Sequence, residues 1–244
     1  MKIALVTGAY KGLGPEWCRQ LMSKGYVVIL TARRLDQAAA AASQLDKDGL
    51  TVIPKAVDVA SEEQISNLAG ELQREFGCLD LLVNNAGINT KDHPDERVVG
   101  KSTFLAELDR DEVLKHVSIN SVSPILMVKH LRRLLNQAEK PVVVSVSSWL
   151  GSVTTKHSMR GHYSYCTSKA ALNMMNRAMS IELKEEGIVS IVVNPGWVQT
   201  DMGGETADLT AEQSVNGLIE NVIEKVTIED TGLFFQWDGT THPW

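Results

Sequence analysis

Residues 3–14 read IALVTGAYKGLG, in which a short apolar run of strand type enters a turn that holds Gly8, Gly12 and Gly14. Helical sequence follows this turn. Glycines at such a point allow the chain to turn sharply and to approach a pyrophosphate closely, and the first N–H groups of the helix attract phosphate. The spacing is GxxxGxG rather than GxGxxG, so a plain glycine-rich turn remains the alternative, but the flanking strand and helix favour a dinucleotide site.

Outward from this turn, short runs rich in β-branched residues alternate with longer helical segments. We expect strands at Ile3–Val6, Val27–Leu30, Val52–Val57, Leu79–Val83, Val142–Val146, Ile188–Val193 and Leu233–Phe235. We expect helices over residues 13–24, 35–47, 61–76, 110–138, 163–186 and 210–225. Continuously apolar strands are typical of a sheet covered on both faces, and repeated β-α units form parallel sheets. The sequence therefore predicts an α/β fold, a Rossmann-type doubly wound parallel sheet of about seven strands flanked by helices, in a single domain over 1–244.

Composition narrows the class of protein. Hydrophobic residues make up 43% of the chain and charged residues 22%, which excludes a disordered, collagen-like or coiled-coil protein. The net charge of −6 gives no attraction for nucleic acid or anionic lipid, so neither is expected as a partner. The three cysteines are widely spaced, without a CxxC pair or a histidine cluster, so we expect no disulfide framework and no metal site. No run suits a signal peptide or a membrane span, and we expect a cytoplasmic location.

One segment lacks clear periodicity. Residues 88–109 contain Pro94, Gly100 and charges of both signs, and we expect a loop with at most short helical pieces. Loops of this length in compact domains are often functional.

The end of the second expected strand predicts which cofactor is bound. It reads Leu30-Thr31-Ala32-Arg33-Arg34, and no carboxylate follows before Asp36. Arg33, together with Lys11 of the glycine turn, places cationic donors where the 2′-phosphate of NADP would lie, whereas NAD requires an acidic residue there. We therefore expect NADP(H) to be preferred, with a solvated loop charge as the alternative for Arg34.

Two further patterns indicate proton-transfer chemistry. Tyr165 and Lys169 lie four residues apart in an expected helix and so share a face, where an ammonium lowers a phenol pKa that starts near 10. Pro124 falls inside another expected helix and has no N–H to give to the carbonyl of Asn120, which should be free to hold a water. A kink without a role is the alternative there.

These motifs, in this order, resemble the short-chain dehydrogenase/reductase family over nearly the whole chain. The run TGxxxGxG is followed by Asp58-Val59, Asn84-Asn85-Ala86-Gly87, Asn120, Ser147-Ser148, Tyr165-Cys166-Thr167-Ser168-Lys169 and Pro195-Gly196-Trp197-Val198-Gln199-Thr200. The run Pro195 to Gly204 and the end of the chain look like the C-factor and sniffer-type carbonyl reductase branch of the family.

The resemblance implies an NADP(H)-dependent oxidoreductase that interconverts a carbonyl and an alcohol by hydride transfer. It implies that Tyr165 is the general acid/base, that Lys169 tunes it and grips the ribose, that Ser148 polarises the substrate oxygen and that Asn120 completes a proton relay. The cofactor-binding residues that it implies are Gly8, Tyr10, Lys11, Gly12, Leu13, Gly14, Arg33, Asp58, Val59, Asn85, Ala86, Gly87, Tyr165, Lys169, Pro195, Gly196, Val198 and Thr200.

The catalytic serine has two candidates. The family usually has about thirteen residues between this serine and the tyrosine, which fits Ser152, whereas Ser148 lies 17 residues before Tyr165. The intact Ser-Ser-x-x-Gly frame favours Ser148, because a loop between Ser152 and His162 accommodates extra residues easily.

Other residues indicate the substrate and the oligomeric state. Trp149, Trp197 and Met202 predict an apolar wall and hence a small apolar carbonyl or alcohol substrate, with Lys156 and Arg160 at the rim. The helices at 110–138 and 163–186 resemble the subunit-packing pair of the family, which suggests a homodimer or homotetramer. A dinucleotide-binding signalling protein with incidental turnover is the alternative function, and a nucleotide-sugar epimerase is a weaker one.

Overall fold

The computed structural model describes residues 1–45, 52–90, 103–157 and 160–244. Within these residues the strands form one parallel sheet of seven, in the order β3-β2-β1-β4-β5-β6-β7. They are β1 (Lys2–Val6), β2 (Tyr26–Ala32), β3 (Val52–Ala56), β4 (Leu81–Asn84), β5 (Val142–Val146), β6 (Val189–Asn194) and β7 (Phe234–Gln236). The doubly wound sheet is thus confirmed, and the expected strand ends differ from these by at most two residues.

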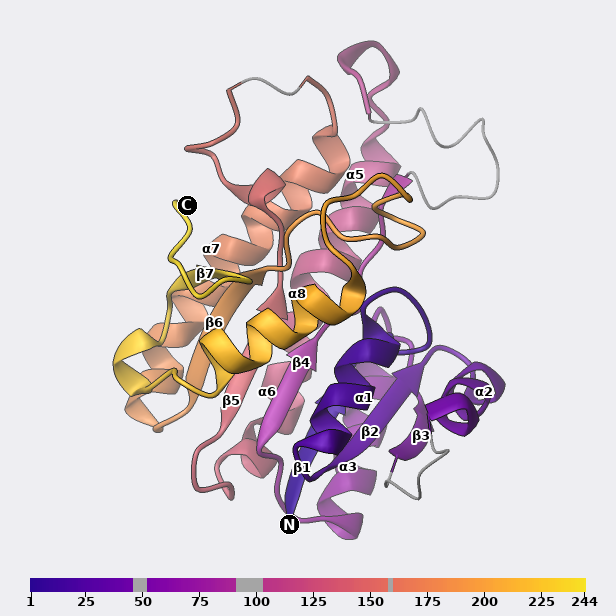
Figure 1. Cartoon of the computed structure of the whole chain (residues 1–244), viewed down its shortest axis with the longest axis vertical. Helices are drawn as coiled ribbons and strands as arrows, with labels where there is room; N and C mark the ends of the chain where they lie inside the picture. The colour runs from indigo at the N-terminus through magenta and orange to yellow at the C-terminus, as the bar shows by residue number, and fades with distance from the viewer. Residues whose placement is uncertain (46–51, 91–102, 158–159) are drawn as a thin grey trace.

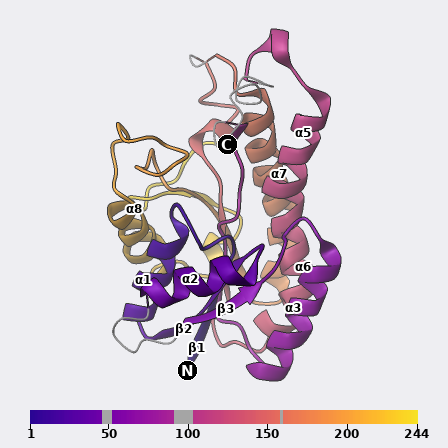
Figure 2. The same cartoon turned by 90° about the vertical axis from the view of Figure 1, so that its right-hand side faces the viewer.

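The helices cover both faces of the sheet, as Figures 1 and 2 show. They are α1 (Gly14–Ser23), α2 (Leu35–Leu45), α3 (Glu62–Glu75), α5 (Arg110–Val117), α6 (Ser123–Leu135), α7 (Tyr163–Glu185) and α8 (Ala211–Gly217). One core layer joins the sheet to α1, α2 and α8, and the other joins it to α3, α6 and α7. Within β1, Ala4 and Val6 face the first layer while Ile3 and Leu5 face the second, because side chains alternate along a strand.

The long helix expected over 110–138 is interrupted. After α5 the chain makes a π-helical turn at Ser118–Val122 and then continues as α6, which ends at Leu135. Pro124 lies in the first turn of α6, directly after the π-helical turn. The helix expected over 210–225 likewise passes from α8 into a π-helical stretch at Leu218–Ile223.

Most of the expected loop at 88–109 lies outside the described residues, as do residues 46–47 of the second expected helix. Of that loop, residues 88–90 continue from β4, and a 3₁₀ turn forms at Leu105–Glu107 before α5 begins. No described helix is both long and apolar enough to cross a membrane.

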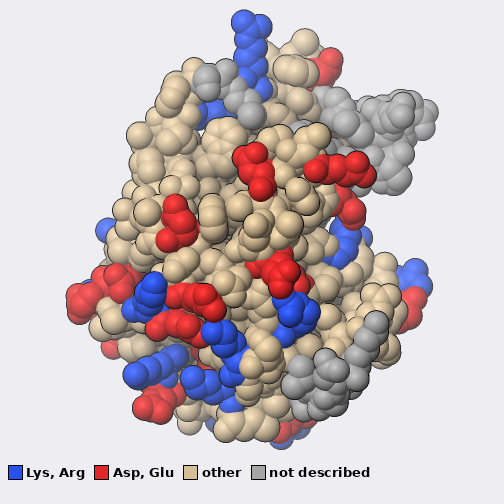
Figure 3. Space-filling model, in the orientation of Figure 1, with Lys and Arg blue, Asp and Glu red and all other residues tan. Residues whose placement is uncertain are grey.

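Charged side chains of both signs are intermixed on the face shown in Figure 3, mainly over its lower part, where Figure 1 places α1 and α8. Several of them pair across these helices, and Arg19 of α1 lies 3.2 Å from Glu212 of α8. Exposed pairs of this kind contribute little stability, so the buried apolar layers hold the helices in place.

Candidate active site

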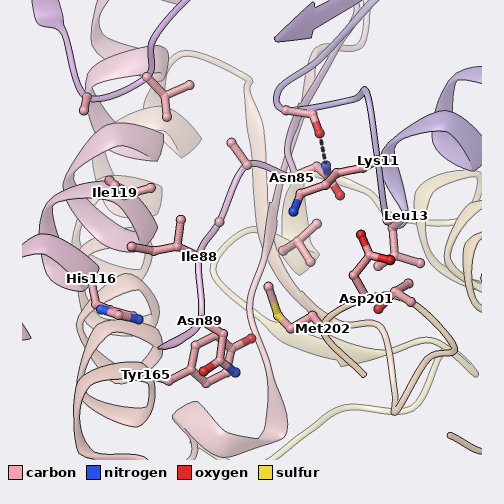
Figure 4. Close-up of a pocket in the computed structure, with 18 of the residues that line it drawn as sticks. Lys11, Leu13, Asn85, Ile88, Asn89, His116, Ile119, Tyr165, Asp201 and Met202 are labelled. Atoms are coloured by element: carbon pink, nitrogen blue, oxygen red, sulfur yellow. Dashed lines mark hydrogen bonds between the residues drawn. The ribbon is translucent and has the colours of Figure 1, made fainter. Parts of the chain in front are cut away.

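A cavity of about 560 Å³ follows the carboxyl-terminal edge of the sheet. Its walls come from the ends of β1 to β6 and the segments that follow them, and from one face each of α5 and α7. Open parallel sheets bind ligands at this edge, because successive strands deliver their loops to the same place. Figure 4 draws 18 of the lining residues as sticks and labels ten of them.

The glycine turn forms one wall, and its geometry requires glycine. Gly8 and Gly12 have φ values of +60° and +63°, in the left-handed region that favours glycine. At Gly14, a Cβ would lie 2.4 Å from the Cα of Ala9, so α1 starts against the turn only because Gly14 has no side chain. The free N–H groups at the start of α1 therefore lie beside the cavity.

Thr7, just before the turn, joins it to the segment after β4. Its hydroxyl oxygen accepts hydrogen bonds from the backbone N–H groups of Asn85 and Ala86, both at 3.0 Å. The Asn85 side chain donates in return to the carbonyl oxygen of Thr7 at 2.9 Å and to that of Gly8 at 3.3 Å. This mutual bonding fixes two cavity walls relative to each other.

The cationic corner consists of Lys11 and Arg33, which both line the cavity. Arg34 does not, because its guanidinium pairs with the Asp36 carboxylate through a bond of 2.9 Å from Nε. Among the described acidic side chains none forms an ion pair with Arg33. Arg33 thus lies at the cavity and Arg34 does not, and the role of Arg33 toward a 2′-phosphate stays a prediction.

Asp58 and Val59 also line the cavity, in the turn between β3 and α3. The Asp58 carboxylate accepts a bond of 3.0 Å from the N–H of Ala60, and Ser61 caps α3 by accepting from the N–H of Gln64. The carboxylate is thus fixed by its own turn, which holds it at the cavity wall.

Tyr165 and Lys169 come together as their spacing predicts. The Lys169 ammonium lies 5.6 Å from the centroid of the Tyr165 ring and donates a bond of 2.8 Å to the carbonyl oxygen of Val146. Lys169 is 5% exposed, and this burial lowers its pKa to about 8. Both residues line the cavity, and a Cβ at Gly87 would lie only 3.7 Å from the lysine Nζ.

Asn120 lies behind this pair rather than in the cavity wall. Its side-chain oxygen accepts from the N–H of Ile88 at 2.8 Å, and its amide donates to the Ile88 carbonyl oxygen and to the Ser168 hydroxyl, both at 2.9 Å. The π-helical turn that carries Asn120 is therefore bonded both to the segment after β4 and to α7. The expectation that its backbone carbonyl holds a water stays a prediction.

The serines at the end of β5 have different environments. Ser147 lines the cavity and donates to the side-chain oxygen of Asn173 at 2.7 Å. The Ser148 oxygen accepts from the N–H of Leu150 at 3.2 Å, and that of Ser152 accepts from Thr155 at 3.2 Å. Ser148 is 9% exposed and Ser152 is 1% exposed, and neither lines the cavity. The smaller exposure of Ser152 favours Ser148, and the assignment stays a prediction.

The segment after β6 closes the remaining side. Pro195, Thr200, Asp201 and Met202 line the cavity, whereas Gly196 and Val198 do not. Trp149 and Trp197 also lie outside the lining, and the Trp197 indole donates to the Gly203 carbonyl oxygen at 2.8 Å while 46% of the residue is exposed. Of the apolar wall expected from sequence, only Met202 is present.

Some functional candidates were not found from sequence. The side-chain oxygen of Asn194 accepts from the N–H groups of Trp149 and Gly196, at 3.2 and 3.3 Å, and so connects the ends of β5 and β6. Glu112, Lys115 and His116 of α5 line the cavity although no motif marked them. Lys156 and Arg160, expected at the rim, line a second cavity beside the start of α7 instead. Among the described residues, no group of three His, Cys, Asp or Glu side chains is placed to hold a metal.

Comparison with known proteins places this architecture in a family. The family model described as short chain dehydrogenase matches residues 2–211. The chain is 38% identical over 168 residues to the C-signal of Myxococcus xanthus, covering 69% of this chain and 94% of that one. It is 35% identical over 248 residues to the 1-hydroxy-2-glutathionyl-2-methyl-3-butene dehydrogenase of Rhodococcus sp. (strain AD45), with all of both chains covered.

Two solved structures have the same fold. The carbonyl reductase Sniffer of D. melanogaster has a TM-score of 0.88 and 27% identity, covering 100% of this chain and 99% of that one. The NADPH-bound carbonyl reductase from chicken fatty liver has a TM-score of 0.87 and 26% identity, with both chains fully covered. These likenesses confirm the expected C-factor and sniffer-type branch. The chain belongs to the short-chain dehydrogenase/reductase family of oxidoreductases.

Proposed function

We propose that the protein is an NADP(H)-dependent oxidoreductase that reduces the carbonyl group of an aldehyde or ketone, or catalyses the reverse oxidation. The observation that carries this proposal is the meeting of Tyr165 and the buried Lys169 in one cavity with the glycine turn and Arg33. The likeness to an NADPH-bound carbonyl reductase supports it.

The residues present fit the cofactor. The glycine turn leaves room for a pyrophosphate beside the start of α1, and Arg33 with Lys11 offers charge-assisted hydrogen bonds to a 2′-phosphate. Asp58 would accept from the adenine amine, and Lys169 would bind the ribose. Thr200, with Pro195, would hold the carboxamide end. When bound, NADPH supplies the hydride that adds to the carbonyl carbon.

Residues of the chain transfer the proton that the reaction requires. Tyr165 gives its phenolic proton to the carbonyl oxygen as the carbon is reduced, and takes a proton back in the reverse direction. With a pKa of about 8, Lys169 is mostly protonated at pH 7, and its ammonium favours the phenolate form of a nearby phenol. Ser148 donates to the carbonyl oxygen, and Asn120 holds the segment after β4 against α7.

The test is turnover of a carbonyl panel with NADPH, followed at 340 nm. Aromatic aldehydes, quinones and diketones are compared with keto acids and sugar phosphates. We expect at least one aldehyde or ketone to be reduced. The absence of turnover with every compound, in a protein that binds NADPH, would favour the second candidate below.

The second candidate is a dinucleotide-binding signalling or interaction protein whose turnover is incidental. The 38% identity with the C-signal of Myxococcus xanthus favours it. NADPH binding without useful turnover, together with an unchanged cellular role in a Tyr165→Phe variant, would distinguish it from the enzyme.

We also propose that the protein is cytoplasmic and assembles as a homodimer or homotetramer. Met174 and Ile181 lie two turns apart on one face of α7 and are 70% and 65% exposed. A second copy would cover this apolar face, and sedimentation of the purified protein tests the assembly.

The proposed substrate differs in one respect from the apolar carbonyl compound that the sequence predicts. Ile88, Ile119 and Met202 line the cavity and fit an apolar carbonyl compound, as expected. However, the two tryptophans are absent from the lining, and the full-length relative from Rhodococcus acts on a glutathionyl compound by its name. A substrate with a polar substituent is therefore included in the proposal.

A further inference from the structure

The wall that α5 contributes to the cavity is polar. Glu112, Lys115 and His116 lie on one face of this helix, and Asn89 and Thr90 lie in the facing segment after β4. Asn89 is 9% exposed and Thr90 is 6% exposed. Buried polar side chains at a cavity wall are retained where a ligand or the protein bonds to them, so this wall suits a polar part of the substrate.

The polar wall lies toward the Tyr165 end of the cavity. In Figure 4, Ile119 and Ile88 are followed along the wall by His116 and then by Asn89 and Tyr165. Glu112 is one helical turn beyond His116, on the same face and farther from Ile119. A substrate whose carbonyl meets Tyr165 therefore extends its remaining part toward this turn of α5.

Glu112 and Lys115 present opposite charges side by side. The Lys115 Nζ lies 3.4 Å from Glu112 Oε1, and the Glu112 side chain is 17% exposed while that of Lys115 is 49% exposed. The first turn of α5 fixes Glu112 further, because the Asp109 carboxylate accepts from the Glu112 N–H at 3.0 Å. The wall thus offers an acceptor for an ammonium and a donor for a carboxylate within one helical turn.

We propose that Glu112 and Lys115 bind a zwitterionic, amino-acid-like substituent of the substrate, with its ammonium at Glu112 and its carboxylate at Lys115. This inference rests on the proposed function, because it concerns the substrate end of the same cavity. Asn89 and Thr90 supply amide and hydroxyl groups for the remaining polar atoms of that substituent.

A substituent with one charge fits less well. A lone carboxylate that approaches Lys115 also approaches Glu112, and a lone ammonium that approaches Glu112 also approaches Lys115, so repulsion cancels part of the attraction. A zwitterion meets both charges with the opposite sign. Specificity then arises from the pair rather than from either residue.

The experiment uses five 4-acetylbenzyl thioethers, which share one reacting ketone that the amino groups cannot reach within the same molecule. Their thiols are cysteine (one ammonium and one carboxylate), glutathione (one ammonium and two carboxylates), thioglycolate (anion only), cysteamine (cation only) and 2-mercaptoethanol (neutral). Dissociation constants are measured by calorimetry on the enzyme saturated with NADP⁺, and kcat/KM is measured with NADPH. Binding tests this inference even where turnover is slow, and turnover of the neutral thioether tests the proposed function separately.

We expect the cysteine and glutathione thioethers to bind about tenfold more tightly than the neutral one, the scale of a charge-assisted hydrogen bond. Glu112→Gln and Lys115→Met should each reduce this ratio severalfold. Glu112→Gln should also tighten binding of the thioglycolate compound, because Lys115 then has no carboxylate beside it. A loss of structure alone would weaken binding of every compound, and would not weaken the zwitterionic compounds while tightening the thioglycolate compound.

The matched control is another exposed Lys–Glu pair, outside the cavity. Lys184 and Glu229 lie 2.8 Å apart, and Lys184→Met and Glu229→Gln should leave all five constants unchanged. Equal binding of the neutral and zwitterionic compounds would overturn the inference. Tightest binding of thioglycolate or of cysteamine would also overturn it, in favour of a singly charged substrate.

Discussion

Lys169 shows how one residue combines a cost in stability with a use in chemistry. Its ammonium is buried against a single backbone carbonyl, and burial lowers its pKa from 10.5 to about 8. The charged form is thus less favourable in the folded protein than in the unfolded chain. The same desolvated charge lies 5.6 Å from the centroid of the Tyr165 ring, and we propose that it favours the phenolate there with little screening by water.

Lys169→Met should therefore stabilise the cofactor-free protein at pH 7 by about 2 kcal/mol. This value is the cost of burying the charge, less the contribution of the hydrogen bond that the variant loses. Between about pH 8 and 10.5 the unfolded lysine holds a proton that the folded one has lost, so the wild type gains stability as the pH rises. The advantage of the variant should shrink over that window. Urea unfolding at several pH values measures it, and a constant difference would contradict the assigned cause.

Arg33 is the residue that we propose as the source of a preference for NADPH. It lines the cavity with Lys11, while the neighbouring Arg34 is engaged by Asp36. A charge-assisted contact contributes about 1.5 to 3 kcal/mol, so NADPH should exceed NADH at least tenfold in kcat/KM, and Arg33→Ala should erase most of this ratio. Arg34→Ala is the matched control and should retain it. Equal use of both cofactors by the wild type would refute this assignment.

The choice between the two serines is tested by two single variants. Ser148→Ala should lower kcat at least tenfold, because one donor to the reacting oxygen is lost, whereas Ser152→Ala should affect mainly stability. The serine oxygens make comparable local bonds, to Leu150 and Thr155, so the loss of local structure is similar. A larger kcat loss at Ser152 would reverse the assignment.

Residues in motifs with fixed spacing were predictable, since strand, turn and helix impose local geometry on Gly8, Gly14, Tyr165 and Lys169. Residues that act between distant segments were not. Asn194 accepts from Trp149, 45 residues away in the chain, and nothing local marks such a contact.

At the scale of elements, the segment after β5 is held from three sides. Gly151 lies so close to α7 that a Cβ there would be 2.8 Å from the backbone of Lys169. Asn194 bonds to Trp149, and the N–H of Thr154 donates to the carbonyl oxygen of Trp244 at 2.9 Å. The last residues thus support the loop that follows Ser148.

Trp244→Ala should loosen this loop. The indole ring lies 5.4 Å from the Phe234 ring, and without it the Trp244 carbonyl is no longer held for Thr154. Hydrogen exchange at the Thr154 amide should quicken about tenfold or more, with NADPH affinity unchanged, since the cofactor contacts lie elsewhere. Trp244→Phe preserves the ring contact, so the Thr154 amide should exchange as slowly in this variant as in the wild type. Unchanged exchange in the alanine variant would contradict the supporting role.

The elements themselves were largely predictable, because most of the strands are continuously apolar runs, and β4 and β6 end at Asn84 and Asn194. The π-helical turn at Ser118–Val122 was not. Its extra residue shifts the register between α5 and α6, and a hydrophobic pattern over so few residues does not distinguish it from an ordinary α-helical turn.

At the scale of the whole molecule, function depends on one edge of the sheet. The parallel order of the strands delivers the glycine turn, Arg33, Asp58 and the segment after β4 to the same side, and α7 adds Tyr165. The parallel pattern predicts this convergence from sequence. The polar wall of α5 was not predictable, because it depends on how that helix is rotated about its axis.

The central claim is that Tyr165 is the proton donor at this edge. The most direct test is Tyr165→Phe, assayed for NADPH oxidation with a carbonyl substrate that the wild type reduces, alongside its NADPH dissociation constant. Because only the transferable proton is removed, turnover should fall by roughly 10² to 10⁴-fold while the dissociation constant stays within about threefold. A variant that keeps near wild-type turnover would contradict the claim and assign the proton to another group.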